Sequence, residues 1–243
     1  MSGARTYTRY ELLRTFRSTR FFFFSLAFPL LLFYLIAAPS KDDKIAGIPV
    51  PLYFMTGMAS WGAMMAVVST GARISGERQT GWNRQLRITP LKVPAYFLAK
   101  VLTGYVMALL SIGLLYGAGL TVGVHLTMVR WLVMTGLILV GLVPFTVLGI
   151  LLGHLLTTDA IGPVMGGIVS LFALLGGVWG PIGDKGFMHG VSQSLPSYWL
   201  VQAGRTALGG DVWPGRGWLV IGGWTLLLVR LATRAYRRDT QRI

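Results

Sequence analysis

The sequence of 243 residues contains no cysteine and few charged residues. Without cysteine the chain can form no disulfide, thiolate nucleophile or cysteine-based metal site. Charged residues make up 12% of the chain, against about 25% in a typical soluble domain, which argues against an ordinary soluble enzyme. A disordered basic tail is excluded too, because 53% of the residues are hydrophobic.

Acidic residues are especially scarce: 8 Asp and Glu stand against 22 Lys and Arg, a formal net charge of +14. Nucleic-acid binding would explain the charge but not the hydrophobicity, whereas a polytopic membrane protein explains both. The long apolar runs carry no carboxylate at mid-depth. That weakens the hypothesis of a proton- or sodium-coupled pump, which usually needs an acid within the membrane.

Six apolar runs are long enough to cross a bilayer as helices. They predict one all-α transmembrane domain over residues 1–243, with spans at about 21–38, 51–72, 95–124, 131–153, 162–180 and 217–232. Residues 1–20 are expected to form an amphipathic interfacial helix. A cleaved signal peptide is the alternative for the first run, but its leader and its apolar run are both longer than usual.

The basic residues indicate how these spans are oriented. Six spans place sixteen of the 22 basic residues on the side that holds both termini. The positive-inside rule makes that side cytoplasmic. Lys100 lies about a turn and a half inside the third span. Its ammonium can reach the surface from there, which favours an interface anchor over a transport-site charge.

Small residues and aromatic residues recur at characteristic places in the predicted spans. Four glycine pairs at helical spacing predict close helix packing: Gly113/Gly117, Gly119/Gly123, Gly149/Gly153 and Gly162/Gly166. Three prolines are expected to kink or start helices: Pro29, Pro144 and Pro163. Tryptophans near span ends indicate an aromatic belt: Trp131, Trp179, Trp199 and Trp218. Contact with an exit path is the alternative for Trp179.

Two loops are expected to hold short helices. Between the second and third spans Glu77 is a lone acid among bases, and Ser75 is placed to cap a helix that starts at Gly76. Trp82 and Leu86 would form its apolar stripe, which can rest on lipid or dock into a partner. Before the last span we expect an external helix with Ser197 as its N-cap, an apolar face and a stop at Gly209.

The usual motifs of enzyme sites are missing. The chain has no P-loop, no H-E-x-x-H motif and no nucleophile elbow. Its histidines are His125, His154 and His189, which lie far apart in sequence and are best interpreted as interfacial residues rather than metal ligands. We therefore expect no catalytic, cofactor or metal site on this chain.

In order and spacing, motifs along nearly the whole chain resemble the ABC-2 type permeases, the membrane subunits of exporters such as those for daunorubicin-type antibiotics. The matching pieces are Glu77-Arg78-x-x-Gly81, Leu86-x-x-Thr89-Pro90-Leu91, Lys100, Gly176-Gly177-x-x-Gly180-Pro181, Leu195-Pro196-x-x-Trp199 and Arg205-x-x-Leu208-x-Gly210. After Pro181 the chain is more polar and glycine-rich than the family pattern.

The resemblance implies roles for two sets of residues and a set of partners. A coupling helix that contacts an ATPase would include Glu77, Arg78, Gly81, Trp82, Arg84, Leu86 and Arg87. An external gate region would include Trp179, Pro181, Pro196, Trp199 and Arg205. Two ABC ATPase subunits would bind ATP and Mg and would pair with two permeases, this chain and a second copy or a homologue. Membrane lipids are further partners, and nucleic acid is not expected.

These observations lead to three hypotheses. The first is a permease that exports a lipophilic or amphipathic compound, such as a drug, an antibiotic or a lipid-like molecule, across the cytoplasmic membrane of a bacterium. The second is a membrane scaffold that binds a cytoplasmic partner without transport. The third, an intramembrane enzyme, is disfavoured because no catalytic constellation lies at membrane depth. Co-purification with a soluble P-loop ATPase would separate the first from the others.

Overall fold

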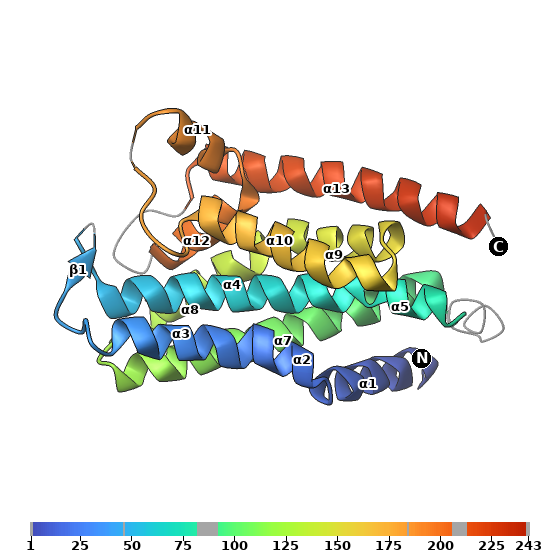
Figure 1. Ribbon diagram of the computed structural model, residues 1–243, viewed down its shortest axis with the longest axis horizontal. Helices are drawn as coiled ribbons and strands as arrows, with labels where there is room; N and C mark the ends of the chain where they lie inside the picture. Colours follow the sequence, from blue (N-terminus) through green and yellow to red (C-terminus); the bar gives the residue numbers. More distant parts are fainter. Residues whose placement is uncertain (1, 46, 82–91, 184, 206–212, 242–243) are drawn as a thin grey trace.

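The computed structural model describes residues 2–45, 47–81, 92–183, 185–205 and 213–241, which form a bundle of helices (Figure 1). Within those residues five helices are long and apolar enough to cross a membrane: Val50–Gln79, Val93–Thr121, Met128–Leu155, Thr158–Gly176 and Gly215–Asp239. Phe23–Ala37 is a shorter apolar helix where the first span is predicted. The all-α architecture is therefore confirmed, and the count of six spans and their orientation stay predictions.

The N-terminal segment is a chain of four helical pieces: α1 (Ser2–Phe16), α2 (Thr19–Phe22), the π-helix η1 (Phe23–Ala27) and α3 (Phe28–Ala37). Pro29 lies in the first turn of α3 and has no N–H to donate to the carbonyl of Ser25. That carbonyl instead accepts a hydrogen bond from Ser111 Oγ at 2.9 Å. Pro29 thus starts a helix, as predicted, and its missing donor helps to tie this segment to a neighbouring helix.

A long helix, α4 (Val50–Ala72), is the buried centre of the bundle. It follows a hairpin of β1 (Lys44–Ile45) and β2 (Ile48–Pro49), whose turn holds Gly47 at φ 78°. Arg73 keeps helical dihedral angles, so α5 (Ile74–Gln79) continues almost directly from α4. The predicted helix start at Gly76 is wrong, because no residue breaks the helix between Ala72 and Ile74.

The remaining helices complete the bundle around α4. They are α7 (Val93–Thr121), α8 (Met128–Gly141), α9 (Val143–Leu155), α10 (Thr158–Gly176), α11 (Phe187–Gln193), α12 (Pro196–Arg205) and α13 (Gly215–Gln241). Pro144 lies in the first turn of α9, which follows α8 directly because Leu142 keeps helical dihedral angles, whereas Pro163 lies inside α10 without ending it. The short helix expected before the last span is present as α12, but Ser197 is inside it and the predicted stop at Gly209 lies outside the described residues.

Only some of the predicted glycine pairs mediate close packing. A Cβ atom on Gly149 would lie 2.5 Å from the Val68 carbonyl oxygen of α4, and one on Gly153 would lie 2.6 Å from the Gly71 oxygen. This pair is confirmed as a helix contact. A Cβ on any glycine of two other pairs would meet no atom within 4 Å, so their interpretation as packing seams is wrong: Gly113/Gly117 and Gly162/Gly166.

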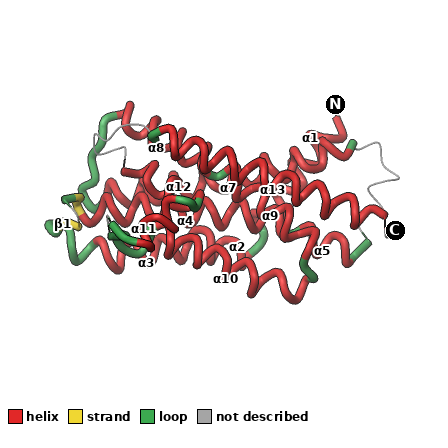
Figure 2. The backbone as a smooth tube through the Cα atoms, turned by 90° about the horizontal axis from the view of Figure 1, so that it is seen from above, coloured by secondary structure: helices red, strands yellow, loops and turns green. Residues whose placement is uncertain are grey.

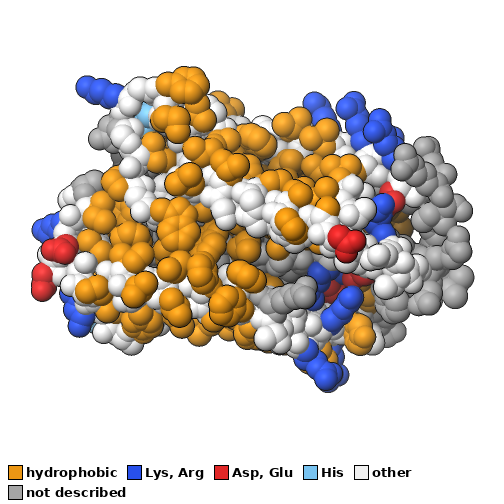
Figure 3. Space-filling view, viewed as in Figure 1, with side chains coloured by type: hydrophobic (Ala, Val, Ile, Leu, Met, Phe, Trp, Pro, Cys, Tyr) orange, Lys and Arg blue, Asp and Glu red, His pale blue; other side chains and the backbone are white. Residues whose placement is uncertain are grey.

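The two ends of the bundle are formed by different elements. Both termini and α5 lie at one end, and the hairpin with α11 and α12 lies at the other (Figures 1 and 2). Hydrophobic side chains cover the middle of the face in Figure 3, and Lys and Arg gather towards its ends. This arrangement matches a bilayer-spanning bundle, and it brings Arg73 and Arg78 to the same end as the described arginines of the N-terminal helix and of the C-terminal tail.

Candidate coupling site

Three helices meet in a buried charge cluster at the end that holds the termini. The ammonium nitrogen of Lys100, in α7, lies 2.7 Å from Glu11 Oε1 of α1 and 2.5 Å from Glu77 Oε1 of α5. All three side chains are only 1% exposed. The expectation that Lys100 is a snorkelling anchor is therefore wrong, since two carboxylates from other helices neutralise its charge inside the protein.

Glu77 is the acceptor at the centre of this cluster. Besides Lys100, its Oε1 accepts from Arg14 Nη1 at 3.0 Å, and its Oε2 accepts from the Tyr96 hydroxyl at 2.6 Å. The Tyr96 ring also lies 5.5 Å from the Lys100 ammonium. A buried carboxylate with several donors has its desolvation cost offset by charge-assisted hydrogen bonds. Glu77 consequently links α5 to α1 and α7.

A fifth charged side chain completes the cluster. Arg73, at the junction of α4 and α5, donates from Nη1 to Thr15 Oγ1 of α1 at 2.9 Å. Glu11 and Glu77 attract its guanidinium, while Arg14 repels it. Three cations thus face two carboxylates, which leaves one positive charge in excess. We call Glu11, Arg14, Arg73, Glu77 and Lys100 the charge cluster.

A second set of polar contacts holds the end of α13 against the same region. Arg78 Nε lies 2.7 Å from Asp239 Oδ2, and His154 Nδ1 lies 3.0 Å from the same oxygen. Arg78 Nη1 also donates to the carbonyl oxygens of Gly153 at 3.2 Å and His154 at 2.8 Å. These carbonyls belong to the last turn of α9, which a cation stabilises. Arg78, His154 and Asp239 form what we call the clasp of α5, α9 and α13.

Comparison with known proteins assigns the chain to a family. The family model described as "ABC-2 family transporter protein" matches residues 35–232, which is most of the chain. The chain belongs to the ABC-2 family of transport permeases. It is also 30% identical over 194 residues to "Putative transport permease YvfS" of Bacillus subtilis (strain 168), covering 77% of this chain and 78% of that protein.

The predicted coupling residues of this permease fall into three groups. Glu77 and Arg78 point into the protein, where they join the charge cluster and the clasp. Gly81 is exposed and adopts φ 70°, a conformation that glycine favours, just after α5 ends. Trp82, Arg84, Leu86 and Arg87 lie outside the described residues. The exposed residues at the end of α5 and just after it are Gln79, Thr80 and Gly81.

The predicted external residues lie at the opposite end of the permease. Trp179 is 37% exposed and packs edge-on against Trp61 with ring centroids 5.3 Å apart. Pro181 is exposed, whereas Pro196, the first residue of α12, is buried. Trp199 is 5% exposed and donates from Nε1 to the Gln193 oxygen at 2.9 Å, so its interpretation as a belt residue is wrong. Arg205 ends α12, and its side chain lies outside the described set.

The sequence interpretation did not single out Glu11, His154 or Asp239 as members of a site. Glu11 had one usable signal, because it is the only acid before the first span. Asp239 is likewise the only acid in the arginine-rich tail. His154 is buried rather than interfacial. Among the described residues no group of three or more His, Asp or Glu side chains is arranged to hold a metal ion.

Proposed function

We propose that the chain is the permease subunit of an ATP-driven exporter for a lipophilic or amphipathic compound, powered by a separate ABC ATPase. Family membership supports a transport permease with such a partner. We further propose that two ATPase copies pair with two permeases at the cytoplasmic membrane. The observation that carries the mechanism is the burial of Glu77 between α5, α1 and α7.

Through Glu77, α5 contacts both α1 and α7, so a displacement of α5 would be transmitted to these two helices. Gln79, Thr80 and Gly81 are exposed and can contact a partner, and Glu77 lies buried on the inner side of the same short helix. A hollow of about 420 Å³ between α5 and the link from α9 to α10 is lined by Arg78, Gln79 and Leu156, among others. A partner that binds here can favour one of two conformations of the permease only if it contacts them differently.

In this proposal Glu77 acts inside the permease rather than on the ATPase surface. ATPase closure would displace α5, and the charge cluster would carry that displacement into α1 and α7. The clasp would carry it into α9 and α13. A scaffold that only binds a partner needs no such internal linkage between five helices, which favours the exporter.

The test uses the full chain co-expressed with its candidate ATPase. Glu77→Gln, which keeps the side-chain shape and adds no buried cation, should leave membrane insertion and ATPase co-purification intact but lower ATP-dependent uptake of lipophilic dyes into inverted vesicles at least several-fold. Asp42→Asn, the same neutralisation of an exposed acid at the far end, is the control and should leave uptake unchanged. Normal uptake with Glu77→Gln would refute the role of Glu77. Isolation of the wild-type chain in a stable complex without any ATPase would instead favour the scaffold.

A further inference from the structure

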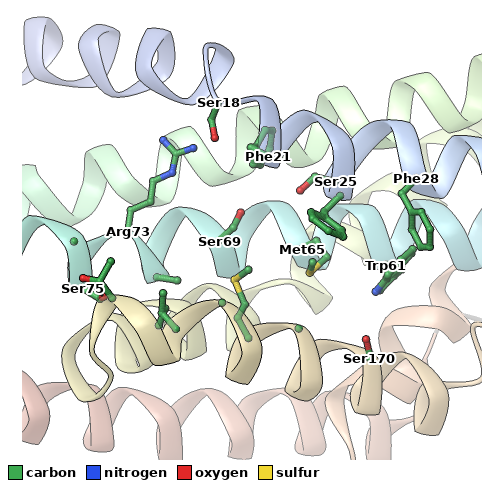
Figure 4. A pocket seen from close by; sticks show the side chains of 18 of the residues that line it. Ser18, Phe21, Ser25, Phe28, Trp61, Met65, Ser69, Arg73, Ser75 and Ser170 are labelled. Atoms are coloured by element: carbon green, nitrogen blue, oxygen red, sulfur yellow. Dashed lines mark hydrogen bonds between the residues drawn. The ribbon is translucent and has the colours of Figure 1, made fainter.

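A cavity of about 750 Å³ opens beside α4 and is not explained by the charge cluster or by the clasp. Its walls come from the N-terminal helical segment on one side, from α10 on the other and from α4 between them (Figure 4). Its volume falls within the roughly 300–1,000 Å³ of small-molecule sites. Gly162 and Gly166 line it, and a Cβ atom on either glycine would meet no neighbouring helix or side chain within 4 Å. The lack of side chains on these two glycines of α10 therefore leaves room for the cavity.

The two ends of this cavity differ in polarity. Arg73 and Ser75 lie at one end and Phe28 and Trp61 at the other, as Figure 4 shows. Arg14, Ser18 and Thr158 join the lining from the elements around the polar end. The apolar part is completed by Phe21, Met65 and Met165. Such a cavity fits an amphiphile with its polar group at the end that also holds both termini.

The charge balance of the polar end favours an anion. In the charge cluster, Lys100 pairs with both carboxylates and Arg14 pairs with Glu77. Within the described residues, no carboxylate lies in ion-pair distance of Arg73, and the only hydrogen bond of its guanidinium there goes to the neutral Thr15 hydroxyl. Arg73 is the cation in excess, and it lines the cavity. Its guanidinium extends from α4 towards the N-terminal segment near Ser18 (Figure 4).

The N-terminus of α10 adds to the positive electrostatic potential at the polar end of the cavity. α10 is 19 residues long, and its first residue, Thr158, lines the polar end of the cavity. The unpaired N–H groups of a first helical turn attract anions. Asp159 follows Thr158, but its side chain is exposed and does not line the cavity. Arg73 and the α10 terminus thus approach the polar end from two helices.

We propose that this cavity binds an anionic membrane lipid, with its phosphate beside Arg73 and an acyl chain along Phe21, Met65 and Trp61. A guanidinium binds a phosphate by charge-assisted hydrogen bonds, and these are strong where water is excluded. The apolar walls remove the acyl chain from water, which favours binding. This site concerns binding alone and does not depend on the proposed export function.

Lipid binding to the full chain in a neutral detergent tests the proposal directly. The probes are phosphatidylglycerol and phosphatidylcholine with identical acyl chains, measured by native mass spectrometry, with glycerol 3-phosphate as a chain-free competitor. We expect phosphatidylglycerol to bind at least tenfold more tightly than phosphatidylcholine. Glycerol 3-phosphate should not displace it at equal concentration. Equal binding of the two lipids would overturn the proposal, and so would full displacement by glycerol 3-phosphate, which would indicate a phosphate site alone.

Substitutions at the two ends localise the binding. Arg73→Gln should weaken phosphatidylglycerol binding about tenfold, the loss of about one charge-assisted contact, whereas Arg73→Lys should retain most of it. Arg9→Gln removes the same charge from an exposed position of α1 outside the cavity and should change nothing. An equal loss in Arg9→Gln and Arg73→Gln would overturn the assignment, because binding would then follow net charge.

A second variant, which does not alter Arg73, tests the apolar part of the cavity and can be used if Arg73→Gln accumulates poorly in the membrane. Gly166→Leu places a side chain into the open space of the cavity without meeting a neighbour at its Cβ. It should abolish binding of both lipids at this site, whereas Gly113→Leu, on α7 outside the cavity, should have no effect. Unchanged phosphatidylglycerol binding by Gly166→Leu would overturn the placement of the acyl chain.

Discussion

Lys100 of α7 holds Glu11 of α1 and Glu77 of α5 at the same time, with its ammonium nitrogen 2.7 Å and 2.5 Å from their carboxylate oxygens. These residues lie 89 and 23 positions away in sequence. The lysine is the one basic residue that the apolar third span encloses. Its burial is therefore tolerated because two other helices supply the opposite charge.

Removal of this lysine should destabilise the permease. Lys100→Met leaves Glu11 and Glu77 buried with fewer partners, and breaking a buried pair in this way costs about 3–5 kcal/mol. Thermal unfolding of the purified chain in detergent measures the effect. Lys92→Met, at an exposed position just before α7, is the matched control and should unfold like the wild type. Equal midpoints for the two variants would contradict the structural role of Lys100.

The close contact of α4 and α9 should not tolerate a side chain on Gly149. Gly149→Ala would place a Cβ atom 2.8 Å from Val68 Cα, so one helix would have to shift, at a cost of about 1–3 kcal/mol. Gly113→Ala meets no atom within 4 Å and should be neutral or slightly stabilising, because alanine favours helix. Unfolding midpoints of both variants check this, and a loss in Gly113→Ala as large as that in Gly149→Ala would contradict it.

The clasp should protect the C-terminal end of α13. Asp239→Asn weakens the contacts to Arg78 and His154, which should cost about 1–2 kcal/mol locally. Trypsin should then cleave the tail at Arg237 and Arg238 severalfold faster than in the wild type. Asp159→Asn removes an exposed acid elsewhere and serves as the control. If the two variants are digested at the same rate, the clasp does not hold the tail.

A disulfide between α5 and α10 should stop transport. Ser75 Oγ and Thr158 Oγ1 lie 3.5 Å apart, and the chain has no native cysteine, so Ser75→Cys with Thr158→Cys gives a single thiol pair. Oxidation should block ATP-dependent dye uptake, and a reductant should restore it. Each single-cysteine variant should be insensitive to oxidant. Full uptake by the cross-linked protein would show that α5 and α10 need not move apart.

Hydropathy located five long apolar helices, because a bilayer imposes a length and a composition on each helix; that each one crosses a membrane stays a prediction. The span predicted at 95–124 corresponds to α7, and the one at 131–153 corresponds to α8 and α9 together. The boundary between α8 and α9 was also predictable, because Pro144 cannot donate a hydrogen bond to the preceding turn. These are local properties, and they need no knowledge of neighbours.

The partners of charged residues were not predictable in the same way. Glu77 stood out as a lone acid, but its role as an internal acceptor depends on α1 and α7, and spacing along the chain does not reveal that contact. A lysine enclosed in an apolar span needs an opposite charge nearby, and that requirement makes Glu11 and Glu77 candidates. The continuity of α4 with α5 was missed because Ser75 and Gly76 resemble a helix start, whereas Arg73 keeps the helix intact.

That continuity has a mechanical consequence. The uninterrupted helix from Val50 to Gln79 has 30 residues and is about 45 Å long, against about 30 Å for the hydrocarbon core of a bilayer. A rod of this kind that tilts about its middle moves its two ends in opposite directions. Near its other end Tyr53 donates a hydrogen bond to the Gly177 oxygen at 2.8 Å, just where α10 ends. A push on one membrane face would thus reach the opposite face as a pull on the end of α10.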